Sequence, residues 1–186
     1  TEKSTFNKQQ IELFCKQNNS SVNGLLNAAF GYTLAQFNGT EKSVYTTIYN
    51  GRNDSRTLNM VGMLVKTLPV VCKAYTNDSD NADNTICSFV NNITNQITQS
   101  MTNDIFSFAE ISHEFGVKAD VIFVYQGDNF NFEKFCGENC KIIDQKLSDA
   151  KAPLTFQVSL SKNEYVFYIE YEKSLYSKKF IQSFTQ

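Results

Sequence analysis

A single histidine limits the catalytic chemistry that this sequence can support. His113 is the only histidine among the 186 residues, so any Ser–His–Asp, Cys–His or histidine–metal arrangement would have to use it. Helical periodicity places it on the polar side of a short segment, between the core-facing Ile111 and Phe115. A general base needs a cleft and an orienting partner, and no sequence neighbour supplies either. We therefore expect a surface histidine and no catalytic residue in this chain.

The cysteines and the acidic residues do not match a known metal-site spacing. Five cysteines, an odd number without a framework spacing, favour reduced thiols and a cytoplasmic protein: Cys15, Cys72, Cys87, Cys136 and Cys140. Cys136-Gly-Glu-Asn-Cys140 could form a disulfide or half of a metal site, but there is no second cysteine pair, so we expect free thiols without zinc. The acidic residues Asp78, Asp80 and Asp83 lack the glycine and later glutamate of a calcium loop, which favours a solvated turn.

Several classes of function are excluded by motif and composition. The sequence contains no GxxxxGK[ST], no GxGxxG after a strand and no GxSxG, so phosphate-cradling and serine-hydrolase sites are not expected. The net charge of −2 argues against a nucleic-acid partner. No run approaches the roughly 20 apolar residues of a membrane helix. The start, Thr1-Glu2-Lys3-Ser4, resembles neither a signal nor a transit peptide, and its missing methionine fits an excised piece.

Two neighbouring segments remain as candidates for function. Asn50-Gly51-Arg52 follows a strand, and Gly51 would permit a turn that aims Arg52. Met60 to Pro69 comes shortly afterwards. Taken alone, these segments would be a glycine turn with a solvent-exposed arginine, followed by an ordinary strand.

Five segments have the periodicity of helices. Apolar residues recur at helical spacing in each, and most begin with a Ser or Asn that can accept from free backbone amides. The first expected helix follows the cap Asn7, and the second runs from Ser20 or Ser21 to Asn38-Gly39. The third spans Ile86 to Met101, the fourth runs from the capping box Ser107–Glu110 to Gly116, and the last follows Ser177.

The strands come between these helices, and together they predict an α/β fold. Extended segments are expected at Val44–Tyr49, Val61–Tyr75 (with Pro69 at an edge or bend), Val121–Tyr125, Leu154–Leu160 and Tyr165–Tyr171. The last two read as an antiparallel hairpin, and the continuous apolar run Val121–Tyr125 as a central strand. Asn77–Asn84 is expected to be a surface turn and Gly127–Pro153 a long excursion loop. We expect one unit over residues 1–186, with a mixed sheet of about five strands and helices packed on one face.

The motifs, in this order, resemble the C-terminal lobe of a nonribosomal peptide synthetase condensation domain, in the chloramphenicol acetyltransferase-like superfamily. Asn59-Met-Val-Gly-Met-Leu-Val-Lys-Thr-Leu-Pro69 is similar to the family's NMVGMFVNTLP and is the most specific match. The remaining matches are Tyr45–Arg52 to the Gly-Arg motif, Asn103–Phe108 to HQDYPFE, Val121–Gln126 to VMFVLQN and Tyr171–Ser177 to EYNTDLF.

The sequence departs from the family pattern in three places. The catalytic HHxxxDG motif, which belongs to the N-terminal lobe, is absent. Lys66 stands where the family usually has Asn, and the RDxSRNPLF segment is shortened to Gly116–Asp120.

The resemblance implies one of two lobes that form a V around a shared active site. It implies amide-bond formation between carrier-bound aminoacyl or peptidyl thioesters, with this lobe inactive alone. Arg52, aimed by Gly51, would pair with the Asp of HHxxxDG across the lobe boundary. Tunnel-lining candidates are Gly62, Val65, Lys66 and Gln126. Gly127–Pro153 would be the latch that reaches the other lobe.

The resemblance also implies partners and leaves alternatives open. This lobe would bind no cofactor itself, since phosphopantetheine is carried by the partner carrier proteins. Its partners would be the N-terminal lobe, peptidyl carrier proteins and an adjacent adenylation domain, with antibiotic biosynthesis as the setting. Exposed interface surface would permit a homodimer of the isolated chain. The alternatives are a non-catalytic carrier-docking module, or a lobe of an epimerisation or cyclisation domain.

Overall fold

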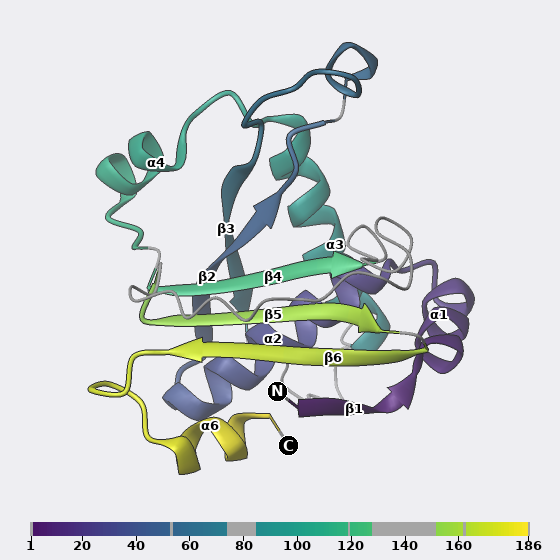
Figure 1. Cartoon of the computed structure of the whole chain (residues 1–186), viewed down its shortest axis with the longest axis vertical. Coiled ribbons are helices and arrows are strands. Elements are labelled where there is room, and N and C mark those ends of the chain that lie inside the picture. Colours follow the sequence, from purple (N-terminus) through teal and green to yellow (C-terminus); the bar gives the residue numbers. More distant parts are fainter. Residues whose placement is uncertain are drawn as a thin grey trace, which may run out of the picture.

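The protein is a mixed α/β structure built on one sheet. The computed structural model describes residues 2–52, 54–73, 85–118, 120–127, 152–161 and 163–185. In this part of the chain six strands pair in the order β1-β6-β5-β4-β2-β3 (Figure 1). They are β1 (Glu2–Asn7), β2 (Lys42–Tyr49), β3 (Lys66–Lys73), β4 (Val121–Gly127), β5 (Leu154–Ser161) and β6 (Glu164–Tyr171).

The interior of the sheet is parallel and its flanks are antiparallel. β4 lies between β2 and β5 and runs parallel to both, which confirms the interior position expected for this apolar strand. β5 and β6 form the expected hairpin, and β2 pairs with β3 from Lys42↔Lys73 to Tyr49↔Lys66. The sheet has one strand more than expected, because β1 joins β6 at the opposite edge from β3. The extended segment foreseen from Val61 is shorter: its strand begins at Lys66.

The expected start signals at Asn7, Ser21, Ser107 and Ser177 and the stops at Gly39 and Gly116 are confirmed as helix caps. They are α1 (Lys8–Gln17), α2 (Val22–Asn38), α3 (Ile86–Thr102), α4 (Phe108–Phe115) and α6 (Lys178–Phe184), with a 3₁₀ turn η1 (Ser55–Thr57). Asn7 forms a capping box with Gln10, and Ser107 forms one with Glu110. Gly39 ends α2 in the left-handed conformation, at φ 62°.

The core lies between the sheet and the helices α2, α3 and α6, which pack on the same face. Phe30 of α2 is its centre and contacts four rings at centroid distances of 4.9 to 5.6 Å: Tyr45, Phe123, Phe156 and Phe184. Tyr45 is completely buried, and its hydroxyl donates to the main-chain oxygen of Asn27 at 2.8 Å. A buried hydroxyl needs such a partner, so this bond fixes β2 against α2.

Three expectations fall on residues that the structure does not describe. The acidic turn at Asn77–Asn84 lies outside the described residues. So do Cys136 and Cys140, and almost all of the excursion between Gly127 and Pro153.

Candidate functional site

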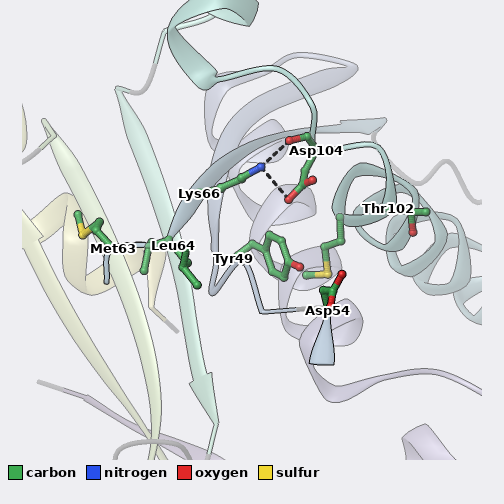
Figure 2. A pocket seen from close by; sticks show the side chains of 10 residues that line it. Tyr49, Asp54, Met63, Leu64, Lys66, Thr102 and Asp104 are labelled. Atoms are coloured by element: carbon green, nitrogen blue, oxygen red, sulfur yellow. Dashed lines mark hydrogen bonds and ion pairs between the residues drawn. The ribbon is translucent and has the colours of Figure 1, made fainter. Parts of the chain in front are cut away.

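A pocket of about 580 Å³ opens where β2 ends and β3 begins. The ends of β2 and β3 and the connection between them form one wall of the pocket. The C-terminal end of α3 and the turn after it form the other (Figure 2). The lining combines apolar and charged side chains: Tyr49, Gly51, Asp54, Met63, Leu64, Val65, Lys66, Met101, Thr102 and Asp104.

Gly51 closes the base of this hairpin connection. Its φ of 68° lies in the left-handed region, which suits glycine. A Cβ placed there would lie 1.8 Å from the main-chain oxygen of Leu64, so the two arms of the connection touch at this point. The glycine is therefore required twice, by its own dihedral angle and by the close approach of Leu64.

Arg52 holds the connection together from within. Its Nη1 donates to the main-chain oxygens of Thr57 and, at 2.9 Å, Met60, while Nη2 lies 3.4 Å from the oxygen of Gly62. The side chain is half-buried. The solvent-exposed arginine that these segments would predict when taken alone is not found, because main-chain carbonyls of the same chain bind the guanidinium.

A second arginine fixes an acidic group at the pocket. Asp54 caps η1 by accepting from the Arg56 amide at 2.8 Å, and its carboxylate also forms an ion pair with the Arg56 side chain at 2.5 Å. These hydrogen bonds from the Arg56 side chain and backbone lower the pKa of the Asp54 carboxyl. The pocket therefore carries a carboxylate at neutral pH.

Lys66 and Asp104 join the two walls of the pocket. Lys66 Nζ lies 2.6 Å from the main-chain oxygen of Asp104 and 3.1 Å from its Oδ2. Figure 2 shows the two side chains turned toward each other. The ammonium is thus already held by a residue of this chain.

The family model for the condensation domain matches residues 3–186. The chain belongs to this family. The match covers both walls of the pocket and, apart from Glu2 at the start of β1, every described element.

Two relatives in sequence are gramicidin S synthases. The chain is 25% identical over 172 residues to gramicidin S synthase 2 of Aneurinibacillus migulanus, and equally to that of Brevibacillus brevis. In both cases the alignment covers 87% of this chain and 4% of the relative, so the chain spans a small part of these synthases.

Solved structures show the same fold. A four-domain nonribosomal peptide synthetase, holo-AB3403 bound to AMP and glycine, has a TM-score of 0.77 at 15% identity, over 99% of this chain and 16% of that one. The first condensation domain of the calcium-dependent antibiotic synthetase, with a substrate analogue, has a TM-score of 0.68 at 10% identity, over 99% and 42%. The epimerization domain of tyrocidine synthetase B reaches 0.68 at 15%, over 99% and 45%. The chain thus spans less than half of a single domain of this fold.

The pocket brings together three of the residues singled out from the sequence of this condensation-family chain. Gly51, Val65 and Lys66 line it, and Arg52 supports the connection beside it. Gly62 belongs to the same connection but does not line the pocket. Gln126 lies elsewhere, on β4, where its Oε1 accepts from Gln157 Nε2 of β5 at 3.1 Å.

Sequence reasoning missed the pocket residues that come from other elements. Tyr49 is the last residue of β2, and Met101 lies near the end of α3. Asp104 falls inside the segment that resembles HQDYPFE, so the motif pointed to its neighbourhood without indicating its contact with Lys66. The position of Asp54 could have been predicted from the sequence, because Asp is a favoured N-cap residue of helices.

The connection between β2 and β3 presents an unusual amount of apolar surface. Val61 and Met63 are almost wholly exposed, and Leu58, Met60 and Val65 are at least half exposed. We call these five residues the apolar connection. Contiguous exposed apolar surface on a protein marks a binding surface more often than chance would give.

The remaining candidate groups stand apart from the pocket. His113 is exposed on α4, as expected. Burial raises the pKa of the Cys15 thiol and that of Cys72, the latter to about 11, so neither is a ready nucleophile. Over the described residues, no helix has the length and apolarity to cross a membrane.

Proposed function

We propose that residues 1–186 form the C-terminal lobe of a condensation domain that joins carrier-bound aminoacyl or peptidyl thioesters by an amide bond. The observation that carries the proposal is the family match over residues 3–186 in a chain that lacks HHxxxDG and whose single histidine is exposed. The catalytic histidine would then come from the N-terminal lobe, and this chain alone would be inactive.

The reaction asks for alignment of two bound substrates. The amine nitrogen of one attacks the thioester carbonyl carbon of the other, the carbon–sulfur bond breaks, and the amine proton leaves for the thiolate. Holding both reactants in line lowers the entropic barrier. In our proposal the phosphopantetheine arms belong to carrier proteins, and this lobe contributes a wall with Gly51, Val65 and Lys66 to the space where the arms meet.

The apolar connection is the surface that we assign to the N-terminal lobe. Its exposed Val61 and Met63 would be buried in a two-lobed domain. Arg52 stands at the base of this surface, and its bonds to described residues use three of the five N–H donors of a guanidinium. It can therefore hold the connection and still bind the carboxylate of the HHxxxDG motif.

We assign Lys66 a role that differs from the one suggested by its position in the family motif. The family usually has Asn there, with an amide to offer to a substrate. Because Asp104 holds the Lys66 ammonium, we assign this residue to the wall of the pocket rather than to a substrate contact.

The other partners follow from the same proposal. Multidomain relatives support peptidyl carrier proteins and an adjacent adenylation domain as neighbours, and the relatives named for gramicidin S and for an antibiotic synthetase support a peptide of that class as product. Free thiols at Cys15, Cys72 and Cys87 support a cytoplasmic setting. In the isolated chain the apolar connection would be free to pair with a second copy.

An epimerisation domain is the second candidate function. The fold matches the tyrocidine epimerization domain and the antibiotic-synthetase condensation domain with the same TM-score of 0.68. The fold alone does not favour either chemistry.

The test is a single-turnover assay of the longer protein that carries this chain. Donor and acceptor carriers are loaded with radiolabelled aminoacyl groups, and the carrier-bound product is analysed by mass and on a chiral column. We expect a dipeptidyl thioester from the longer protein and none from the 186-residue chain. Inversion of a single aminoacyl group without bond formation would establish epimerisation instead. Carrier binding with neither reaction would establish a docking module.

A further inference from the structure

At Val71, the outer edge of β3 is covered by one side chain of α3. In the part of the chain that the structure describes, β3 pairs with β2 on one side only, so its other side would normally present free backbone groups. The side chain of Gln96 meets two of them. The Val71 amide donates to Gln96 Oε1 at 2.8 Å, and Gln96 Nε2 donates to the Val71 oxygen at 3.0 Å.

These two hydrogen bonds are the same as those that a neighbouring strand would make with Val71. In an antiparallel ladder, alternate residues direct both the N–H and the C=O to the same side. Val71 directs its N–H and C=O toward Gln96. The backbone N–H and C=O groups of Thr67 and Lys73, and the C=O of Pro69, therefore also face the outer edge. Pro69 has no N–H to donate. Val71 is therefore the position where an added strand would gain the most, and Gln96 already occupies it.

The side chains around this edge suit a second copy of the same chain. Val44 and Val71 are directly paired, and both are exposed at 47% and 42% on the sheet face that the helices leave open. Two β3 strands related by a two-fold axis at Val71 would exchange two Val71 N–H to Val71 C=O bonds. They would also bring four valines together. Such an arrangement is self-complementary, as two-fold interfaces must be.

We propose that Gln96 keeps the outer edge of β3 closed against strand pairing with a second copy of this chain. The inference is independent of the proposed function. It assigns Gln96 a task that its place in the middle of α3 does not reveal, since a helix interior needs no such side chain. Removing the amide would leave two edge groups free for intermolecular bonding.

The experiment compares Gln96→Ala and Gln96→Leu with wild type by sedimentation equilibrium. Gln96→Leu keeps the size and helix propensity of the side chain, so it guards against a variant that fails to fold. Because each bond that moves between chains contributes about 1 kcal/mol, we expect self-association to tighten about tenfold or more in both variants. Gln99→Ala, an exposed position one turn further along α3, is the matched control and should sediment as wild type.

A second substitution locates the interface. Val71→Lys should return Gln96→Leu to the behaviour of wild type, because two lysines would face each other across the pair. Hydrogen exchange should show a faster Val71 amide in dilute Gln96→Leu and renewed protection at high concentration. The proposal is overturned if the Gln96 variants sediment as wild type although the Val71 amide exchanges faster. It is also overturned if Val71→Lys leaves their association unchanged.

Discussion

The ammonium of Lys66 is bound by Asp104, at 2.6 Å from its main-chain oxygen and 3.1 Å from its carboxylate. The two residues are 38 positions apart and belong to opposite walls of the pocket. Their contact links the first residue of β3 to the turn that follows α3. Because Lys66 replaces the Asn usual at this position, the ion pair is a feature of this chain that bears directly on the shape of the pocket.

We expect Lys66→Met to lower the free energy of unfolding by less than about 1 kcal/mol, since partly exposed ion pairs contribute little. The Lys66 and Asp104 side chains are 43% and 25% exposed. Urea unfolding at low and at high salt measures the effect, and the difference from wild type should shrink with salt. Lys73→Met, at the exposed far end of β3, is the control. A loss of several kcal/mol that salt does not alter would contradict this account.

Gly51 should be far less tolerant of substitution than Gly39. Both have a left-handed φ, of 68° and 62°. A Cβ at Gly39 would meet nothing within 4 Å, whereas one at Gly51 would collide with the main-chain oxygen of Leu64. We expect Gly39→Ala to cost about 1 kcal/mol, from the dihedral alone, and Gly51→Ala at least about 2–3 kcal/mol. Equal losses in thermal unfolding would show that the connection moves aside freely.

Much of the fold follows from local sequence patterns. The helix starts at Asn7, Ser21 and Ser107 were predictable, because each cap bonds to residues only three positions away. The interior position of β4 followed from its uninterrupted apolar run. The hairpin β5–β6 followed from alternation on both sides of a polar turn.

The features that could not be predicted from the sequence depend on partners far along the chain or on main-chain groups, which are the same for every residue type. β1 is largely polar and becomes a strand by pairing with β6, more than 150 residues later. Arg52 bonds to main-chain carbonyls, which have no side-chain signature. Gln126 accepts a hydrogen bond from Gln157 of β5, 31 positions away, and nothing in the Gln126 segment indicates this partner. In each case the deciding contact lies outside any local window.

Arg52→Ala should destabilise the isolated chain, because Arg52 is bound within it. The substitution removes the donors to the oxygens of Thr57, Met60 and Gly62. Hydrogen bonds to a charged group are worth more than neutral ones, and the site is half-buried, so we expect a loss of about 1–3 kcal/mol in urea unfolding. Arg52→Lys should be intermediate, because one ammonium cannot reproduce the planar fork.

Arg56→Ala is the matched control for Arg52. Arg56 is 85% exposed and pairs with Asp54 at the surface, where solvent screens the pair, so its loss should cost clearly less than that of Arg52. If Arg52→Ala proved as mild as Arg56→Ala, the guanidinium would not be organising the connection. The contact with the N-terminal lobe that we propose would then be the main role of Arg52.

Cys72 should make the stability of the chain fall at alkaline pH. Its side chain is completely buried, and desolvation raises the pKa of the thiol to about 11. In the unfolded chain the pKa is near its ordinary value of about 8.5, so the unfolded state releases its proton first. The contribution of Cys72 is therefore complete below about pH 8.5 and is lost as pH rises toward 11, by on the order of 3 kcal/mol.

The measurement is the slope of unfolding free energy against pH from 8 to 11, for wild type and Cys72→Ala. Lysines and tyrosines titrate in both proteins, so the difference between the two slopes isolates the thiol. We expect the wild-type curve to fall more steeply, whatever stability Cys72→Ala loses at neutral pH by leaving a cavity. Peptide-mapped alkylation of the native chain at pH 8.5 should agree, with Cys87, which is only half-buried, labelled well before Cys72. Parallel curves together with rapid labelling of Cys72 would mean that β3 opens readily at the covered edge.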